Sequence, residues 1–483
     1  MNIREFLFKN KTARQTVAKN TFWLFFGQIF SKLIKLAIIV YAARVLSVNG
    51  YGAFSYALSL AGFFTTFADF GLNATIVRES SKDLSIQEKY FSTALVIKLI
   101  MLALISISVI VLSPLLFKDK AVADLMPIVI LIVAFDSLRD FGASLARAWE
   151  KMEIEAVVQI ITNVFIVAGG FLALYYSKTP KALSLGYVLG TGLGMISAFY
   201  PFRRYLKNVK KTFSKSIIKT LLYSSWPMGI LAVMGTVMLN TDNLMIAWLK
   251  SITEVGYYSA PLRITQIIFI VPAMITVALF PQTAKLADQK ERLVKIVEKS
   301  LALMIILALP LTIGGILLSQ KIIVLLFGYR YIPATITFMI MSLMFIPTFM
   351  SNALGNQLFA LRKERQLLIY AALGIFGNLF FDILLIPPFG IAGSALASLI
   401  NTIIITLYLY FSLKKHLQFR VISSFTKTII ASAVMVGFIE GLLNLNINVL
   451  LIIISSALAY IVSLIILKEE TAIDIKNIIL QRQ

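Results

Sequence analysis

The sequence lacks cysteine altogether and contains a single histidine, His416, among its 483 residues. Disulfide bonds, thiol chemistry, Cys/His zinc sites and a Ser-His triad are therefore excluded as a basis for function. Charged residues are also scarce, at 14% of the chain, whereas 59% of the residues are hydrophobic and the mean hydropathy is +0.87. This balance excludes a soluble globular domain and indicates an integral membrane protein, for which we expect no cofactor and no metal site.

Acidic residues number 23 against 45 lysines and arginines, which gives a formal net charge of +22. In a soluble protein this excess would suggest a nucleic-acid partner. Here 31 of the 45 basic residues lie in alternate connectors between apolar segments, the N-terminal tail included. Lysine and arginine accumulate in the cytosolic loops of membrane proteins. We therefore expect no nucleic-acid binding, and a multi-pass protein of the plasma (inner) membrane with both termini in the cytosol.

Long apolar segments dominate the chain, and about fourteen of them are long enough to span a bilayer as helices. They do not alternate as barrel strands would, so the predicted fold class is an all-α membrane protein. Pro272, Pro310 and Pro347 interrupt long segments and are predicted to mark bends. Connectors are too short for a soluble catalytic or nucleotide-binding domain, so an enzyme is not expected. The predicted spans are 20–46, 51–77, 91–117, 125–149, 155–176, 182–202, 221–249, 256–281, 300–318, 334–361, 367–387, 390–413, 428–443 and 449–467.

An internal repeat emerges when "LSVNGYGAFSYAL" (residues 46–58) is laid over "KSITEVGYYSAPL" (residues 250–262), a shift of 204 positions. Serine, glycine, serine and leucine coincide, and both segments join an outward span to an inward one. Repeats of this kind are common in transporters. We therefore predict two pseudo-symmetric six-helix halves, an N-lobe (1–206) and a C-lobe (207–413), followed by spans thirteen and fourteen and a cytosolic tail (414–483).

Ionisable side chains within spans cost at least about 2.5–3.5 kcal/mol each at mid-membrane, so they indicate a bundle interior or a watery cavity. Lys32 and Lys35 share one helix face with Gln28 and Ser31 in the first span. This cationic stripe predicts a site for an anionic headgroup. The alternative is that both lysines extend outward to the membrane surface.

The fourth span carries four charged residues, of which Asp136, Asp140 and Arg147 fall within a sector about 40° wide. Arg139 lies to one side, where it can pair with Asp136 three residues earlier or contact substrate. Arg147 is expected near the cytosolic surface as an anchor. Lys98, in the third span, could line the transport pathway or act as an anchor.

Asp242 and Arg263 flank the second copy of the repeat and are predicted to lie at matching depth, about 10 Å below the outer surface. A salt bridge between them would lock the hairpin. Alternatively, Arg263 turns toward a central cavity and binds a phosphate, for which a planar guanidinium is suited, and both readings can hold. Asp382 and Glu440 are the mid-membrane ionisable residues of the last four spans, and they are the candidates for ion coupling.

Several stretches together resemble the polysaccharide and oligosaccharide-lipid flippases of the multidrug/oligosaccharidyl-lipid/polysaccharide exporter superfamily. They are "ARVLSVNGYGAFSYAL", "DFGLNATIVRE", "DNLMIAWLKSITEVGYYSAPLRI", "FPQTAKL" and "FGIAGSALAS". The resemblance implies two six-helix bundles around a V-shaped central cavity, two additional helices, and alternating access that flips a polyprenyl-diphosphate-linked glycan outward. By position, Lys32, Lys35 and Arg263 resemble the basic residues that line this cavity in lipid II flippases.

The leading hypothesis is a flippase for a polyprenyl-(di)phosphate-linked oligosaccharide in surface-polysaccharide biogenesis. Its partners would be the lipid-linked substrate, membrane lipids and other polysaccharide assembly proteins, and we expect a monomer. A cation-coupled multidrug exporter of the same fold is the alternative, but its cavity should be lined by carboxylates and aromatics rather than lysines. A lipid II flippase is a second alternative, although the first span carries lysines where arginines would be expected. A membrane glycosyltransferase would need a large outer loop or a catalytic acid cluster, and neither is visible.

Overall fold

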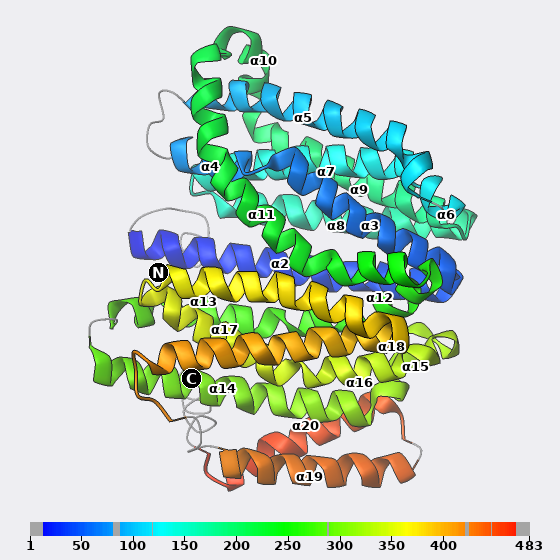
Figure 1. Ribbon diagram of the computed structural model, residues 1–483, viewed down its shortest axis with the longest axis vertical. Coiled ribbons are helices and arrows are strands. Elements are labelled where there is room, and N and C mark those ends of the chain that lie inside the picture. Colours follow the sequence, from blue (N-terminus) through cyan, green and yellow to red (C-terminus); the bar gives the residue numbers. More distant parts are fainter. Residues whose placement is uncertain are drawn as a thin grey trace. The chain divides into compact units, whose positions relative to one another are not determined.

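The protein is all-helical throughout the residues that the computed structural model describes, which are 13–80, 87–117, 119–286, 289–420, 425–445 and 447–469. Both predicted cytosolic ends, residues 1–12 and 470–483, lie outside the described residues. The chain divides into two units, residues 1–256 and residues 257–483 (Figure 1). The first unit extends past residue 206 because α11 packs against α3, α4 and α5. The predicted lobe boundary at 206 stays a prediction.

The first unit consists of long helices joined by short turns. Two of them, α8 and α9, approach closely because glycines line the contact. A Cβ atom at Gly186 would lie 2.6 Å from the amide nitrogen of Gly170. Small residues let membrane helices approach backbone to backbone. The helices are α2 (Ala13–Val45), α3 (Val48–Asp69), α4 (Leu72–Ser80), α5 (Gln87–Leu116), α6 (Lys120–Ala123), α7 (Met126–Ala148), α8 (Met152–Tyr176), α9 (Pro180–Phe199), η1 (Tyr200–Phe202), α10 (Arg203–Thr212), α11 (Lys215–Leu249) and the first turn of α12 (Ile252–Ile268).

The break between α3 and α4 bends the predicted second span by 44°. Phe70 and Gly71 both have positive φ, at 35° and 82°. A side chain at Gly71 would overlap the carbonyl oxygen of Ser225 in α11, so glycine is required both for the backbone conformation and for the close contact. The bend places Asp69 at the end of α3, directly before the break.

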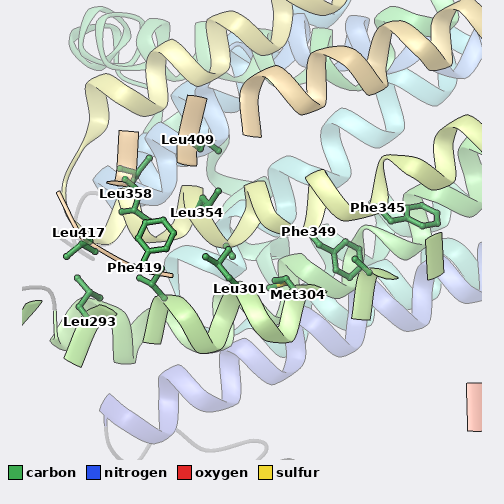
Figure 2. Close-up of a cluster of buried hydrophobic side chains, with 14 residues drawn as sticks. Leu293, Leu301, Met304, Phe345, Phe349, Leu354, Leu358, Leu409, Leu417 and Phe419 are labelled. Atoms are coloured by element: carbon green, nitrogen blue, oxygen red, sulfur yellow. The ribbon is translucent and has the colours of Figure 1, made fainter. Parts of the chain in front are cut away.

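The second unit is built around a buried apolar cluster that α14, α17 and the end of α18 share (Figure 2). Leu301 and Met304 of α14 face Phe349 and Leu354 of α17, and Leu409 of α18 closes the cluster. The helices that follow α12 are α13 (Ile270–Lys285), α14 (Lys290–Leu317), α15 (Ser319–Phe327), η2 (Tyr329–Ala334), α16 (Thr335–Leu343), α17 (Phe345–Ala360), α18 (Glu364–Lys414), α19 (Phe425–Asn444) and α20 (Val449–Ile466).

Helix α18 consists of two helical arms joined at a kink, where the chain folds back on itself. Gly390 has φ 58° and ψ −135°, directly after two prolines at 387 and 388. The two arms pack antiparallel: the Asn401 amide donates to the Gly374 carbonyl at 2.8 Å, and the Ser398 hydroxyl to the Asn378 side-chain oxygen at 3.1 Å. The 51 residues would measure about 76 Å as one straight helix, more than twice the hydrocarbon thickness of a bilayer.

By length and composition, eleven helical segments of the described chain can cross a membrane, or up to twelve when the bent pair α3 and α4 is one span. Breaks occur at Phe269 and Met344, each three residues before a proline, Pro272 and Pro347. Pro310 lies inside α14, which continues without a break. Two of the three predicted bends are therefore confirmed as helix breaks.

Candidate functional site

Arg139 lies between two carboxylates of its own helix, α7. Its Nη1 atom is 2.6 Å from Asp136 Oδ1, and its Nη2 and Nε atoms donate to Asp140 Oδ1 at 2.7 and 3.2 Å. The predicted pair with Asp136 is confirmed, and Asp140 adds a second. Because three donors of one guanidinium are engaged, Arg139 offers little to a further anion.

The two lysines of α2 have different surroundings. The Lys35 ammonium lies 5.0 Å from the centre of the buried Tyr187 ring and close enough to Asp136 for their charges to attract. Lys32 is exposed, and it makes no ion pair with any residue that the structure describes. Lys35 is thus partly balanced by a carboxylate, whereas Lys32 presents a positive charge.

Further charge pairs connect α8 with α2 and α7. The buried Lys19 ammonium lies 2.9 Å from Glu153 Oε2, and Arg147 Nε lies 3.4 Å from Glu155 Oε2. Sequence reasoning missed the two glutamates, although their position in the first turn of α8 is the usual place for acidic residues. Arg147 was expected to be a surface anchor, and the structure gives it a carboxylate partner. Lys19 and Arg147 therefore each lie beside a carboxylate of α8.

Lys98 is fully buried in α5. Its ammonium lies 2.7 Å from Asp69 Oδ1 and 3.1 Å from Asn73 Oδ1, and 5.6 Å from the centre of the Phe141 ring. Asp69 ends α3 and Asn73 lies in α4, so the lysine bridges the break between the two helices. The charge also lies at the carboxyl end of α3, where a cation is favoured.

Arg263 and Asp242 lie on different units, in α12 and α11. The Arg263 Nη1 atom donates to Gln266 Oε1 at 3.2 Å, and its buried Nε has no hydrogen-bond partner in the part of the chain described. Leaving a buried donor of a charged group unsatisfied is costly, so this N–H is available to donate to a ligand oxygen. Asp242 is half-buried. A salt bridge between the two residues stays a prediction.

The two candidates for ion coupling differ in burial. Asp382 is fully buried in the α18 hairpin, where the Ser394 hydroxyl donates to Oδ1 at 3.1 Å and the Asn378 amide to Oδ2 at 3.3 Å. Glu440 is exposed and lies four residues before the end of α19, or about 6 Å along the helix. Glu440 is thus nearer to the helix end than to the middle of the span.

An apolar groove of about 830 Å³ lies within the second unit. Its walls come from α12, α13, α14, α19 and α20, and Ser456 and Tyr460 are its polar contributors. The Tyr460 hydroxyl is already used, because it donates to the Ile306 carbonyl at 2.8 Å. Sequence reasoning missed the groove because its residues do not differ in type from lipid-facing ones. Representative lining residues are Ile268, Leu307, Leu311, Met435, Ala457 and Ile461.

Comparisons with known proteins give consistent relatives. The pattern of a family described as "Polysaccharide biosynthesis protein" matches residues 17–287. The "Putative O-antigen transporter" of Shigella flexneri is 25% identical, covering 82% of this chain and 97% of its own. The "Probable low-salt glycan biosynthesis flippase Agl15" of Haloferax volcanii is 23% identical, covering 88% and 89%.

Among solved structures, the lipid II flippase MurJ in an inward closed conformation aligns with a TM-score of 0.77 and 19% identity, covering 91% of this chain and 97% of its own. An inward-facing multidrug resistance MATE family transporter of the MOP superfamily aligns with a TM-score of 0.67 and 11% identity, covering 80% and 96%. At these identities the two structures show a shared fold.

Proposed function

The chain belongs to the polysaccharide biosynthesis protein family, and from this premise we propose that it flips a polyprenyl-(di)phosphate-linked oligosaccharide from the cytosolic to the outer leaflet. Alternating access would carry the headgroup across the membrane for cell-surface polysaccharide biogenesis. Relatives that match over most of their length are named as an O-antigen transporter and a glycan biosynthesis flippase. The lipid-linked oligosaccharide and the surrounding membrane lipids are the partners of this activity.

The apolar groove of the second unit carries the proposal furthest. Its volume of about 830 Å³ is within the range of small-molecule sites, yet it offers almost no hydrogen-bonding group. A sugar or a phosphate would lose its hydration there without replacement. An isoprenoid chain needs no such replacement and gains burial of its methylene and methyl groups. A segment of the polyprenyl tail is therefore the occupant.

The headgroup contacts are assigned by the availability of donors. Lys32 is exposed, Lys35 has one cation–π contact and a nearby carboxylate, and Arg263 has a buried Nε with no hydrogen-bond partner in the described chain. These three bind the phosphates. Arg139 and Lys98 are held by carboxylates and stabilise the helices around the pathway.

The multidrug exporter alternative is less consistent with these features. Organic cations would be repelled by Lys32, Lys35 and Arg263, whereas a diphosphate is attracted by them. A lipid II flippase remains the second alternative. The flipping assay described below distinguishes the two by the saccharide that the fluorescent lipid carries.

The proposed topology has fourteen spans in two six-helix halves plus two further helices. Folding of α18 into a hairpin adds one span to the twelve that pass by length and composition, and α7 adds another despite its four charged residues. The first residues of α9 contact the start of α3, since a Cβ at Gly50 would lie 3.2 Å from Pro180 Cγ. Helix α10, with five basic residues in ten, follows the other end of α9 and is therefore cytosolic. The turn before α3 is outer, and both termini are cytosolic.

The test uses purified protein in liposomes with a fluorescent polyprenyl-diphosphate-linked saccharide, whose headgroup is made accessible to a membrane-impermeant quencher by flipping. Ala457→Phe fills the groove, while Leu458→Phe places the same side chain at a neighbouring exposed position outside the lining. We expect Ala457→Phe to reduce flipping of the long-chain substrate at least tenfold and that of a short-chain analogue much less. Equal loss for both chain lengths, or no loss, would remove the groove from the transport pathway.

A further inference from the structure

A second, smaller pocket lies within the second unit, where the two ends of the α18 hairpin meet. Its volume is about 310 Å³, and its lining comes from the first two turns of α18, the last two turns and the residue that caps them. Unlike the apolar groove, this pocket offers two positive charges, an amide and two hydroxyl groups. The lining residues are Arg365, Gln366, Ile369, Tyr408, Ser412 and Lys415, without a carboxylate among them.

The protein itself does not neutralise the two cations of this pocket. Arg365 and Lys415 are exposed, and neither forms an ion pair with a residue that the structure describes. Glu364 precedes Arg365 in the chain but lies outside the lining. Lys414 is used differently, since its ammonium donates to the Tyr410 hydroxyl at 3.0 Å. Arg365 and Lys415 are therefore available to an anionic ligand.

The positive charge around the pocket also acts on the next residue, His416. Burial is the first cause that lowers the pKa of its imidazole, and repulsion by Lys363, Lys415 and Lys290 lowers this pKa further. Surroundings that disfavour a further positive charge favour a negative one. An anion beside Lys415 would therefore be stabilised.

The pocket lies where charged residues give way to apolar ones. Ile369 is one helical turn from Arg365, and Phe411 is one turn from Lys415, in both arms toward the middle of the hairpin. Both apolar side chains are exposed, at 40% and 57%. A ligand with its anionic group at Arg365 and Lys415 would therefore extend an apolar part along Ile369 and Phe411.

We propose that this pocket binds the phosphate of an anionic phospholipid, whose acyl chains lie along Ile369 and Phe411. Basic pockets between transmembrane helices on the cytosolic side bind phospholipid headgroups. The volume is at the lower end of small-molecule sites, which suits a phosphate with a glycerol group and is too small for an oligosaccharide. The adjoining stretches "RKER" and "KKHLQFR" belong to the basic, cytosolic set of connectors. The ligand is thus a lipid of the cytosolic leaflet, and the site is independent of the transported substrate.

The test measures the preference of the pocket for an anionic over a zwitterionic lipid. Because the chain has no cysteine, Phe411→Cys provides a single position for a fluorophore, which a brominated acyl chain quenches on contact. The protein is placed in bilayer nanodiscs with increasing proportions of dibromo-phosphatidylglycerol or dibromo-phosphatidylcholine. Each basic residue near a membrane surface favours an anionic lipid by about fivefold, so two should give phosphatidylglycerol a preference of about 25-fold.

Charge removal shows whether the pocket or the general surface charge attracts the lipid. Arg365→Gln/Lys415→Gln should reduce the preference to less than twofold. The matched control is Lys295→Gln/Lys414→Gln, which removes two exposed charges outside the lining, near the start of α14 and at the end of α18, and should keep at least a tenfold preference. The same loss in both variants, or an unchanged preference in Arg365→Gln/Lys415→Gln, would overturn the proposal.

Filling the pocket tests its shape while both charges are kept. Ile369→Trp occupies the apolar side of the pocket and should lower the preference at least fivefold. Leu368→Trp places the same side chain at a neighbouring exposed position outside the lining, and it should leave the preference unchanged. Equal preferences in the two tryptophan variants would show that the lipid does not enter the pocket.

Competition identifies the source of the phosphate. Neither inorganic phosphate at millimolar concentration nor a short-chain prenyl diphosphate should relieve the quenching by dibromo-phosphatidylglycerol. Relief by inorganic phosphate would assign the pocket to a free anion, and relief by the prenyl diphosphate at a lower mole fraction than phosphatidylglycerol would assign it to the transported lipid. Either result would overturn the phospholipid site. None of these measurements requires transport, so a failure of the proposed function would leave them unaffected.

Discussion

Replacing Lys98 by methionine tests whether this residue stabilises the α3–α4 break or binds substrate. Methionine retains much of the apolar stem but removes the ammonium, which lies 2.7 Å from Asp69 Oδ1 and 3.1 Å from Asn73 Oδ1. The lysine side chain is 0% exposed and the aspartate 19% exposed. The substitution therefore leaves a largely buried carboxylate without its cation.

Removing one partner of a buried ion pair typically costs about 3–5 kcal/mol. This case lies at the lower end of that range, because Asp69 is partly exposed and also accepts a hydrogen bond from the backbone amide of Asn73 at 3.3 Å. We expect Lys98→Met to lower the free energy of unfolding by about 3 kcal/mol, which is a factor on the order of 10² in the folding equilibrium. Lys98→Met/Asp69→Asn should recover most of this loss, since the uncompensated charge is gone.

The assay is reversible unfolding in mixed detergent micelles, followed by tryptophan fluorescence, with flipping measured on the same preparations. Lys89→Met is the matched control, because Lys89 is exposed near the start of the same helix, and it should change stability by less than about 0.5 kcal/mol. If Lys98→Met kept full stability but lost flipping, Lys98 would belong to the substrate path and the structural role would be refuted.

Three further predictions follow from the charged groups. Arg263→Ala should abolish flipping while the folded yield stays normal. Arg263→Lys should restore flipping only in part, because an ammonium cannot bind a phosphate bidentately. Full activity of the alanine variant would exclude Arg263 from the site. Arg139→Lys should lower the free energy of unfolding by about 1–2 kcal/mol, since one ammonium cannot replace donors to both Asp136 and Asp140, and unchanged unfolding would contradict this. Partial burial, and then three neighbouring lysines, lower the pKa of His416, so the imidazole is neutral at pH 7 and above. We therefore expect His416→Gln to leave the flipping rate between pH 7 and 8.5 unchanged. If the unmodified protein showed a change of rate in this pH range that the variant lacked, His416 would titrate there.

Local features of the fold could be predicted from the sequence because they depend on neighbours along the chain. The shift of 204 between the two repeated turns anticipated helix boundaries that recur at the same spacing, and the i, i+3 spacing anticipated the pair of Arg139 with Asp136. Breaks near Pro272 and Pro347 also follow from local backbone chemistry.

Partners on other helices could not be predicted in this way. Lys98 and Asp69 lie on different helices, and pairing them requires the rotation of α5 relative to α3, which packing determines. The apolar groove was invisible for a related reason, since leucine and isoleucine serve a lipid-facing surface and a groove equally well. The depth of Glu440 in the membrane could not be predicted from hydropathy, because it depends on where α19 ends.

The central claim is that the chain moves the headgroup of a lipid-linked oligosaccharide across a bilayer. The most direct measurement is headgroup translocation by the purified protein in liposomes, with a fluorescent polyprenyl-diphosphate-linked oligosaccharide and, in parallel, a fluorescent organic cation. The account predicts protein-dependent flipping of the lipid, loss of that flipping in Arg263→Ala, and no transport of the cation. Transport of the organic cation without flipping of the lipid would contradict it.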